Sequence, residues 1–172
     1  MLKMVDNYLL LEKIESGQVN LARAPISILD LVNEIKKNFS DLKIGGNISI
    51  SLKKQAANFL DSELLQKKVL INENIFPSLI SNLLRNAIEA SPEGLVLVNV
   101  YAEDSLCISF SNQGVIPDEI QKNLFQKFNT SKRNGTGLGL YSAKMIAEAH
   151  GGKLIYEPLP EGTRFIVTLP LI

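Results

Sequence analysis

The sequence predicts an α+β domain: a two-layer sandwich in which helices pack on a mixed, mostly antiparallel β-sheet, with a helical appendage at the N-terminus. Two periodicities lead to this fold class. Apolar residues at every second position predict strands, whereas apolar residues three and four positions apart predict amphipathic helices. Several of the predicted strands follow one another with only a short turn between them, as antiparallel neighbours do.

Length, composition and charge limit what the chain can be. Its 172 residues, 45% apolar and 21% charged, suit one globular domain with room for an appendage. Eighteen basic residues balance eighteen acidic ones, so we expect neither nucleic acid nor a membrane surface as a partner. The single cysteine, Cys107, excludes a disulfide framework and a thiolate zinc site. Because no apolar run approaches ~20 residues and no signal peptide is visible, we expect a cytoplasmic chain or the cytoplasmic piece of something longer.

Residues 1–18 predict the helical appendage, which ends at Gly17. Its apolar residues Met1, Met4, Tyr8 and Leu11 fall three and four positions apart and form a face that needs a partner. Two interpretations stay open. The helix folds back on its own domain, or, as we favour, it is the end of a helical hairpin or coiled coil whose other half lies upstream. Residues 19–172 then form the main domain.

Helices and strands alternate along the main domain. A strand is predicted over residues 19–25, and Pro25 is expected to open a helix that reaches residue 39. Further helices are predicted over residues 74–91 and 118–127, and one begins near residue 138 with Leu138, Tyr141, Met145 and Ala149 on one apolar face. The remaining strands are predicted over residues 48–52, 68–72, 95–102, 105–112, 153–157 and 164–170.

The stretch "RNGTGLGLYSAKMIAEAHGG", residues 133–152, carries the strongest chemical signal. It is not a Walker loop, because Ala147 stands where the first glycine belongs and Leu154 where serine or threonine belongs. It is not a dinucleotide fingerprint either, because Leu140 occupies the place of the third glycine. What remains is a glycine-rich loop that feeds a helix, and the free amides at such a helix start favour an anion.

Positive and polar side chains near this loop strengthen the anion-site interpretation. Lys132 and Arg133 add charge, and Thr136 adds a hydroxyl donor. Asn82 and Asn86 lie four apart in "NLLRNAIEAS" and share a helix face, where an amide oxygen suits Mg²⁺. Asn112 continues the buried phase of "LCISFSN" and needs a polar partner, such as an adenine amino group or a backbone group. Solvated or capping asparagines are the alternative.

The motifs "NLLRNAIEAS", "SNQGVIP", "LFQKFNTSK", "GTGLGL" and "AEAHGG", in this order, resemble the catalytic and ATP-binding domain of sensor histidine kinases. That domain belongs to a superfamily shared with gyrase, Hsp90 and MutL. The resemblance covers roughly residues 24–171 and implies ATP and Mg²⁺ as ligands. It also implies that residues 1–18 are the end of the family's dimerisation hairpin.

The resemblance implies a role for each matching position. Asn86 would hold Mg²⁺ against the triphosphate, with Asn82 supporting the phosphates. Asn112 would read adenine, Phe125 and Phe128 would anchor the ATP lid, and Lys132 would reach the terminal phosphates. The full set of implied nucleotide-binding residues is Asn82, Asn86, Glu89, Asn112, Gly114, Ile116, Phe128, Lys132, Gly135, Thr136, Gly137, Leu138, Gly139 and Leu140.

Two departures from the family pattern bear on affinity. The family usually has an aspartate where Asn112 stands, and the loop "NQGVIP" is one residue short. An amide oxygen still accepts from the adenine amine, but losing the charge-assisted part costs on the order of 1 kcal/mol. We therefore expect weak but real ATP binding. Glu89 stands where many members have a phosphate-contacting lysine, and its role stays open.

His150 is the only histidine, and it lacks the neighbours expected around a phosphoacceptor. We expect it to pack at a helix end, so the resemblance places the phosphoacceptor on a hairpin of the parent chain. The implied partners are that hairpin, a response regulator receiver domain and, in the full-length protein, a second copy; the chain would be the cytoplasmic part of a sensor. Two alternatives remain: a degenerate nucleotide-sensing or docking module, and a gyrase- or Hsp90-type ATPase. The second is disfavoured because Asn82 stands where those relatives carry a water-activating glutamate.

Overall fold

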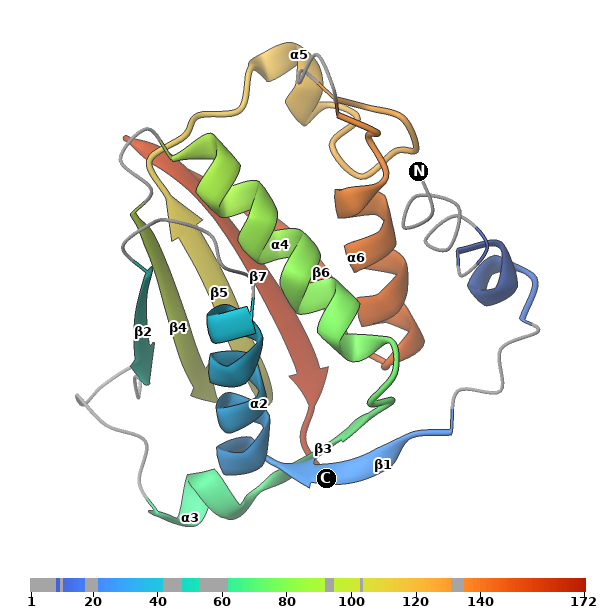
Figure 1. The fold of residues 1–172 in the computed structure, drawn as a ribbon, viewed down its shortest axis with the longest axis vertical. Coiled ribbons are helices and arrows are strands. Elements are labelled where there is room, and N and C mark those ends of the chain that lie inside the picture. The colour runs from blue at the N-terminus through green and yellow to red at the C-terminus, as the bar shows by residue number, and fades with distance from the viewer. Residues whose placement is uncertain are drawn as a thin grey trace.

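The computed structural model describes residue 9 and residues 11–17, 22–41, 48–52, 62–91, 95–102, 104–130 and 135–172. Its larger sheet has the strand order β2-β4-β5-β7-β6 (Figure 1). Strand β2 (Ile48–Leu52) runs parallel to β4 (Val96–Ala102). All other neighbours in this sheet are antiparallel: β4 with β5 (Ser105–Asn112), β5 with β7 (Gly162–Pro170), and β7 with β6 (Lys153–Leu159). The predicted mixed, mostly antiparallel sheet is confirmed.

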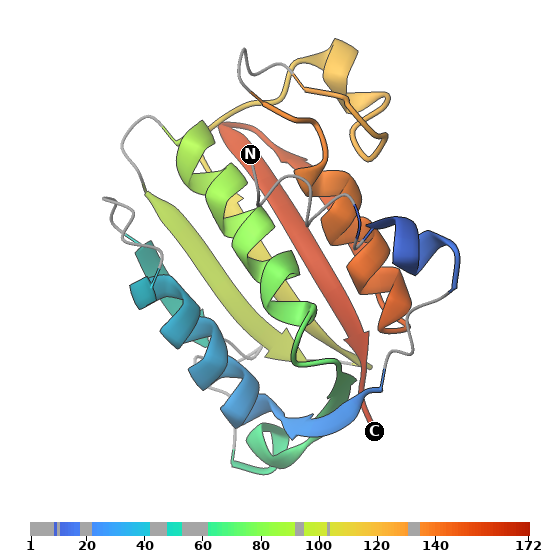
Figure 2. The same ribbon diagram turned by 45° about the vertical axis from the view of Figure 1, so that its right-hand side comes forward.

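Three helices lie across one face of this sheet: α2 (Ile28–Asp41), α4 (Phe76–Ala90) and α6 (Gly139–Ala149) (Figures 1 and 2). The core lies between the two layers, where the apolar stripes of the helices meet the alternating apolar residues of the strands. Its fully buried members include Ile28, Leu31, Ile35, Leu79, Leu83, Leu84, Leu106, Ile108 and Phe110. The two-layer α/β sandwich is therefore confirmed.

A second, two-stranded sheet lies at the opposite end of the helices from α5. Strand β1 (Ala24–Ser27) pairs antiparallel with β3 (Lys68–Ile71), which follows the short helix α3 (Ser62–Gln66). An isolated bridge between Val69 and Leu171 joins β3 to the end of the chain. This small sheet links the first strand to the last and closes the domain at that end.

The helix predicted to open at Pro25 begins three positions later, because Pro25 is a residue of β1, where it pairs with Leu70. The start signal is Ser27, whose hydroxyl oxygen accepts from the backbone N–H of Asp30 at 3.1 Å. The Ser27 hydroxyl also donates to the Asp30 carboxylate at 2.6 Å. Such a serine cap satisfies one of the N–H groups left open at a helix start.

The helix predicted over residues 118–127 is wrong beyond its first turn, since α5 comprises only Asp118–Gln121. Single turns follow it, with bonds from Asn123 N–H to the Ile120 carbonyl and from Gln126 N–H to the Asn123 carbonyl. The Asn129 side-chain amide donates to the carbonyls of Ile120 and Asn123 at 3.1 and 2.7 Å. The Ile120 and Asn123 carbonyls thus accept from N–H groups three positions on and from the Asn129 side chain, and not from N–H groups four positions on as in a longer α-helix.

The apolar face predicted for α6 is not the one that enters the core. The buried residues of α6 are Ser142, Ala143, Ile146 and Ala147, whereas Tyr141 and Met145 are half-buried beside them. Of the predicted N-terminal helix, residues 11–15 are helical and most of the rest lies outside the described residues. Within the described part of the chain, no helix is both long and apolar enough to cross a bilayer.

Candidate functional site

A cavity of about 840 Å³ opens where one face of α4, the N-terminus of α6 and the end of β5 meet. Its volume lies within the range of about 300–1,000 Å³ that is usual for small-molecule sites. Most of the residues implied by the sequence line it: Asn82, Asn86, Glu89, Asn112, Gly114, Ile116, Gly135, Thr136, Gly137, Leu138, Gly139 and Leu140. Segments far apart in the sequence thus meet at one site.

Helix α4 supplies one wall of the cavity. Ser78, Ser81, Asn82, Arg85, Asn86 and Glu89 recur three and four positions apart, so they form one polar stripe, while Leu79, Ile80, Leu83 and Leu84 enter the core. Among the described residues, only Asn82 Nδ2 and Asn99 Oδ1 are buried side-chain polar atoms without a hydrogen-bond partner. Because an unsatisfied buried donor costs free energy, Asn82 Nδ2 marks a place where a ligand acceptor would bind.

The end of β5 supplies a second wall with a defined amide orientation. Asn112 is 7% exposed, as its strand phase predicts, and its Nδ2 donates to the Gly114 carbonyl at 3.4 Å. The Thr163 hydroxyl donates to the same carbonyl at 2.6 Å. With Nδ2 occupied in this way, Oδ1 is left as the acceptor of the Asn112 side chain.

Thr163 is a wall residue that sequence reasoning missed. It is 1% exposed, and it pairs with Asn112 across the β5–β7 ladder. Its only local signal is that it follows Gly162 at the start of a strand, which is common for threonine. Its position beside Asn112 follows from the register of two strands that are distant in sequence.

The packing around Gly114 leaves no room for a side chain. A Cβ built on it would stand 2.2 Å from the Ala90 carbonyl oxygen at the end of α4. The loop after β5 therefore approaches the helix end so closely that no side chain fits. This contact brings the loop after β5 against the α4 wall, which is the arrangement that forms the cavity.

The loop of residues 135–139, here named the phosphate loop, leads into α6. Gly137 has φ +66°, and a Cβ on it would lie 2.4 Å from the Phe128 carbonyl carbon. The Phe128 N–H donates to the Gly137 carbonyl at 3.1 Å, which joins the turn before the loop to the loop itself. Across the cavity, a Cβ on Gly139 would lie 3.6 Å from Asn86 Nδ2, so the Asn86 amide stands next to the start of α6.

The start of α6 has the features of an anion site. No side-chain cap bonds the first turn, and this turn has no acidic residue. The Leu138 N–H donates to the Thr136 hydroxyl oxygen at 3.4 Å, and Gly139 and Leu140, whose N–H groups follow, also line the cavity. The backbone N–H groups at this helix end and the helix dipole together attract negative charge.

Of the implied nucleotide-binding residues that the structure describes, Phe128 alone does not line the cavity wall. Phe128 is 64% exposed and has φ +64°. Its backbone N–H bonds to the phosphate loop, but its ring is not packed there. Phe125 takes the packing role instead, since its ring lies edge-on to Phe165 at 6.4 Å between centroids and packs against the core. Lys132 and Arg133 lie outside the described residues.

His150 is a structural residue, as its position at the end of α6 predicts. It is 2% exposed, its Nδ1 donates to the Ile146 carbonyl at 2.6 Å, and its Nε2 accepts from the Asn72 N–H at 2.9 Å. Its ring packs edge-on against Phe76. Burial lowers the pKa of His150, which keeps the ring neutral. With both ring nitrogens bonded to the backbone, neither is placed to take a phosphoryl group.

Other wall residues escaped the sequence analysis because polar side chains on a helix or turn carry no specific signal. They are Ser78, Ser81, Arg85, Asn129, Thr130 and Ser142. Among the described residues, no three His, Cys, Asp or Glu side chains gather to hold a metal ion. A divalent cation at this wall would thus rest on amide oxygens, water and ligand oxygens, a set that suits Mg²⁺.

Comparison with known proteins gives concordant results. The family model described as histidine kinase-, DNA gyrase B-, and HSP90-like ATPase matches residues 72–172. The circadian input-output histidine kinase CikA of Synechococcus elongatus is 32% identical over 180 residues, which cover 99% of this chain and 23% of that protein. This chain therefore spans about a quarter of that relative's length.

Solved structures agree. The catalytic domain of histidine kinase ThkA matches with a TM-score of 0.67 at 26% identity, over 86% of this chain and 95% of that one. Full-length ShkA in complex with AMPPNP matches with a TM-score of 0.76, over 99% of this chain and 35% of that one. Its identity of 21% shows a common fold alone.

Proposed function

This chain belongs to the family of histidine kinase-, DNA gyrase B- and HSP90-like ATPases, as the catalytic, ATP-binding domain of a histidine kinase, and from this premise we propose that it presents the γ-phosphate of ATP to a histidine on a separate helical hairpin. The observation that carries the assignment of the site is the buried, unpartnered Asn82 Nδ2 in a cavity that also contains the start of α6. A donor and a helix N-terminus on facing walls suit the oxygens of a polyphosphate.

We propose that adenine binds at the Asn112 end of the cavity. Asn112 Oδ1 would accept from the adenine amino group, because Nδ2 already donates to the Gly114 carbonyl. The Thr163 hydroxyl donates to the same carbonyl and holds it in place. Ile116 and Phe165 add apolar surface to the same wall, which suits the faces of a base.

The triphosphate would lie between α4 and the phosphate loop. Asn82 Nδ2 would donate to a phosphate oxygen, and the backbone N–H groups of Gly139 and Leu140 would face the developing negative charge. Asn86 would hold Mg²⁺, which neutralises phosphate charge when bound. Glu89, in the wall near Asn86, would be tolerated beside the phosphates in the presence of that ion.

The chain's own contribution to catalysis is positioning and electrostatics. The side-chain amides of Asn82 and Asn86 and the backbone N–H groups at the start of α6 orient the γ-phosphate. Position 82 carries an asparagine, so it offers no carboxylate to activate water. We therefore expect slow hydrolysis and transfer only when an acceptor histidine approaches. Rapid steady-state turnover without an acceptor would instead favour the gyrase- or Hsp90-type ATPase.

The test is transfer of label from ATP in trans. The acceptor is the longer parent chain with its own catalytic site disabled, and the donor is this chain. We expect acid-labile phosphate on the acceptor, dependent on Mg²⁺ and lost with Asn86→Ala. If Mg-ATP binds but no hairpin is ever labelled, the degenerate nucleotide-sensing or docking module is the correct function, an alternative that Asn112 and the short adenine loop favour.

The partners and location follow from the same proposal. Residues 1–18 would continue upstream into the histidine-bearing dimerisation hairpin, and residues 19–172 would form the catalytic domain. The full-length protein would be a homodimer that passes its phosphoryl group to a response regulator receiver domain. We propose a bacterial, cytoplasmic setting for this domain, whether or not the whole sensor is anchored in a membrane.

A further inference from the structure

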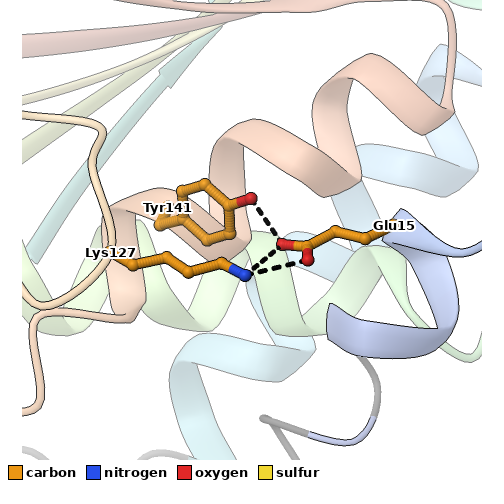
Figure 3. Close-up of polar contacts among 3 residues, drawn as sticks. All are labelled: Glu15, Lys127 and Tyr141. Carbon is orange, nitrogen blue, oxygen red and sulfur yellow. Dashed lines mark hydrogen bonds and ion pairs between the residues drawn. The ribbon is translucent and has the colours of Figure 1, made fainter.

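Three segments that are distant in sequence meet at one carboxylate outside the cavity (Figure 3). Glu15, from the N-terminal helical segment of residues 11–17, contacts Lys127 Nζ with both oxygens, Oε1 at 2.7 Å and Oε2 at 2.8 Å. The Tyr141 hydroxyl donates to Oε1 of the same carboxylate. Lys127 Nζ also lies 5.1 Å from the centre of the Tyr141 ring. We name this arrangement the Glu15 bridge.

The bridge joins the two ends of the chain segment that forms one side of the cavity. Lys127 directly precedes Phe128, whose N–H bonds to the Gly137 carbonyl, and Tyr141 lies in the first turn of α6. Between these ends, Asn129, Thr130 and Gly135 to Leu140 line the cavity. Neither Lys127 nor Tyr141 lines it. The bridge therefore contacts the residues that flank this wall and does not itself line the cavity.

The N-terminal segment is held at this place by apolar contacts as well. Leu11 is 1% exposed, and Ile14 packs against the core cluster. Glu15 follows Ile14, so docking these two residues presents its carboxylate to Lys127 and Tyr141. Burial of the leucine side chain stabilises this docking independently of the carboxylate. Removing the carboxylate alone should thus leave the segment docked and the fold intact.

We propose that Glu15 is a positioning residue for nucleotide binding: by bridging Lys127 and Tyr141 it fixes residues 128–130 against the start of α6 and so orders the phosphate-facing wall before the nucleotide arrives. This inference rests on the proposed ATP site. A link that already holds residues 127–130 near the start of α6 reduces the conformational entropy that these residues lose when a ligand binds. The electrostatics agree, because the hydrogen bonds from Lys127 and Tyr141 lower the pKa of Glu15 and keep it ionised.

The bridge also gives the upstream chain a physical route to the site. By linkage, if docking of residues 11–17 improves nucleotide affinity, the nucleotide must strengthen the docking by the same factor. A helix continuing upstream from this segment would change affinity by moving Glu15 toward or away from Lys127. The Glu15 bridge is the contact through which that movement would be transmitted.

The first test compares Glu15→Ala with Glu12→Ala by calorimetry. Glu12 lies on the same helical segment and is exposed, so its substitution removes an equal charge outside the bridge. Because exposed ion pairs contribute little, we expect Glu15→Ala to weaken AMPPNP binding about two- to fivefold and Glu12→Ala to leave it unchanged. Affinity for adenosine, which reaches only the Asn112 end, should be the same in both variants.

The second test measures the coupling between Glu15 and Lys127. Lys127→Met should weaken AMPPNP binding as Glu15→Ala does, and the double variant should lose no more than either single one. In hydrogen exchange, AMPPNP should protect the amides of residues 11–17 in the wild type and not in Glu15→Ala. Equal effects of Glu15→Ala and Glu12→Ala, additive losses, or an equal loss of adenosine affinity would overturn the inference. A wild-type chain that binds no AMPPNP would instead overturn the proposed function.

Discussion

At the scale of single residues, burial decides which polar side chains are structural and which are open to a ligand. His150 is buried and Asn82 is half-buried with a buried Nδ2, but His150 has both ring nitrogens bonded to the backbone, whereas Asn82 Nδ2 has no partner. The first is a satisfied group that stabilises the fold. The second is an unsatisfied donor in a cavity wall, which is the usual mark of a binding site.

His150 should make stability depend on pH. Its pKa is lowered in the fold by burial, so the unfolded chain binds more protons between the lowered native value and the ordinary value of 6.5. The stabilising contribution of neutral His150 is complete above about pH 6.5 and is lost as the pH falls through that window, by at most about 1.4 kcal/mol per pH unit.

The measurement is urea unfolding of the wild type and His150→Gln at pH values from 7.5 to 5. Glutamine does not titrate, and all other groups are shared, so the stability advantage of the wild type should shrink as the pH falls. An advantage that is constant over this range would show that His150 does not titrate differently in the native and unfolded states.

Asn112 decides the strength of adenine recognition. An aspartate at this position would offer the adenine amino group a charged acceptor, and a charge-assisted bond is roughly twice as strong as a neutral one. We expect Asn112→Asp to improve ATP affinity about fivefold, as measured by calorimetry, corresponding to on the order of 1 kcal/mol. An unchanged affinity would show that Asn112 does not read the base.

At the scale of elements, the ends of helices and the turns between them set the geometry of the site. Helix α6 begins where the phosphate loop arrives, and the loop after β5 contacts the end of α4 at Gly114. Both junctions depend on backbone approaching backbone, which only glycine permits. The site is thus assembled from element ends, whereas the stability of the domain comes from the buried faces of the same elements.

Gly137→Ala should damage the phosphate loop. A Cβ would stand 2.4 Å from the Phe128 backbone, and φ +66° costs a non-glycine residue about 1–2 kcal/mol. We expect at least a tenfold loss of AMPPNP affinity in calorimetry. Gly151→Ala is the matched control, because Gly151 also has a positive φ of +75° but does not line the cavity, and its Cβ would meet Pro170 at an ordinary 3.6 Å. Equal affinities in the two variants would contradict this account of the loop.

Ser27→Ala should weaken the start of α2. The variant loses the hydroxyl that accepts from the Asp30 N–H, and the loss of such a cap typically costs about 1 kcal/mol. Urea unfolding should show this loss, while Ser27→Thr, which keeps the hydroxyl, should retain most of the stability. Equal stabilities of the alanine and threonine variants would show that the cap contributes nothing.

At the scale of the whole molecule, the cavity joins both layers of the sandwich, so a ligand there should stabilise the fold as a unit. At a hundred times its dissociation constant, a ligand that binds only the native state adds about 2.7 kcal/mol. For a domain of this size, that corresponds to a rise in Tm of about 5–11 °C. The measurement is thermal unfolding with Mg-AMPPNP, controlled by sodium chloride at equal ionic strength. Asn82→Ala should reduce the rise at the same ligand concentration, and an undiminished rise would exclude Asn82 from the site.

The sequence by itself determined the fold class, most of the strands and part of the cavity lining. The reason is that these features rest on local patterns: alternation in β4 and β5, helical spacing of Asn82 and Asn86, and glycines before α6. Local patterns misled at Pro25, where pairing with β3 holds the residue in a strand, and over residues 118–127, where single turns bonded by the Asn129 side chain replace the helix.

Only the tertiary structure decided which distant groups meet. Thr163 reaches the Gly114 carbonyl because β5 and β7 pair with Asn112 opposite Thr163. Glu15 reaches Lys127 and Tyr141 because a separate helical segment docks its apolar side on the domain. A periodicity describes one element and which of its faces is buried. The register of a pairing and the place of a docking depend on how two elements fit, and that information is held in their packed surfaces rather than in either stretch of sequence.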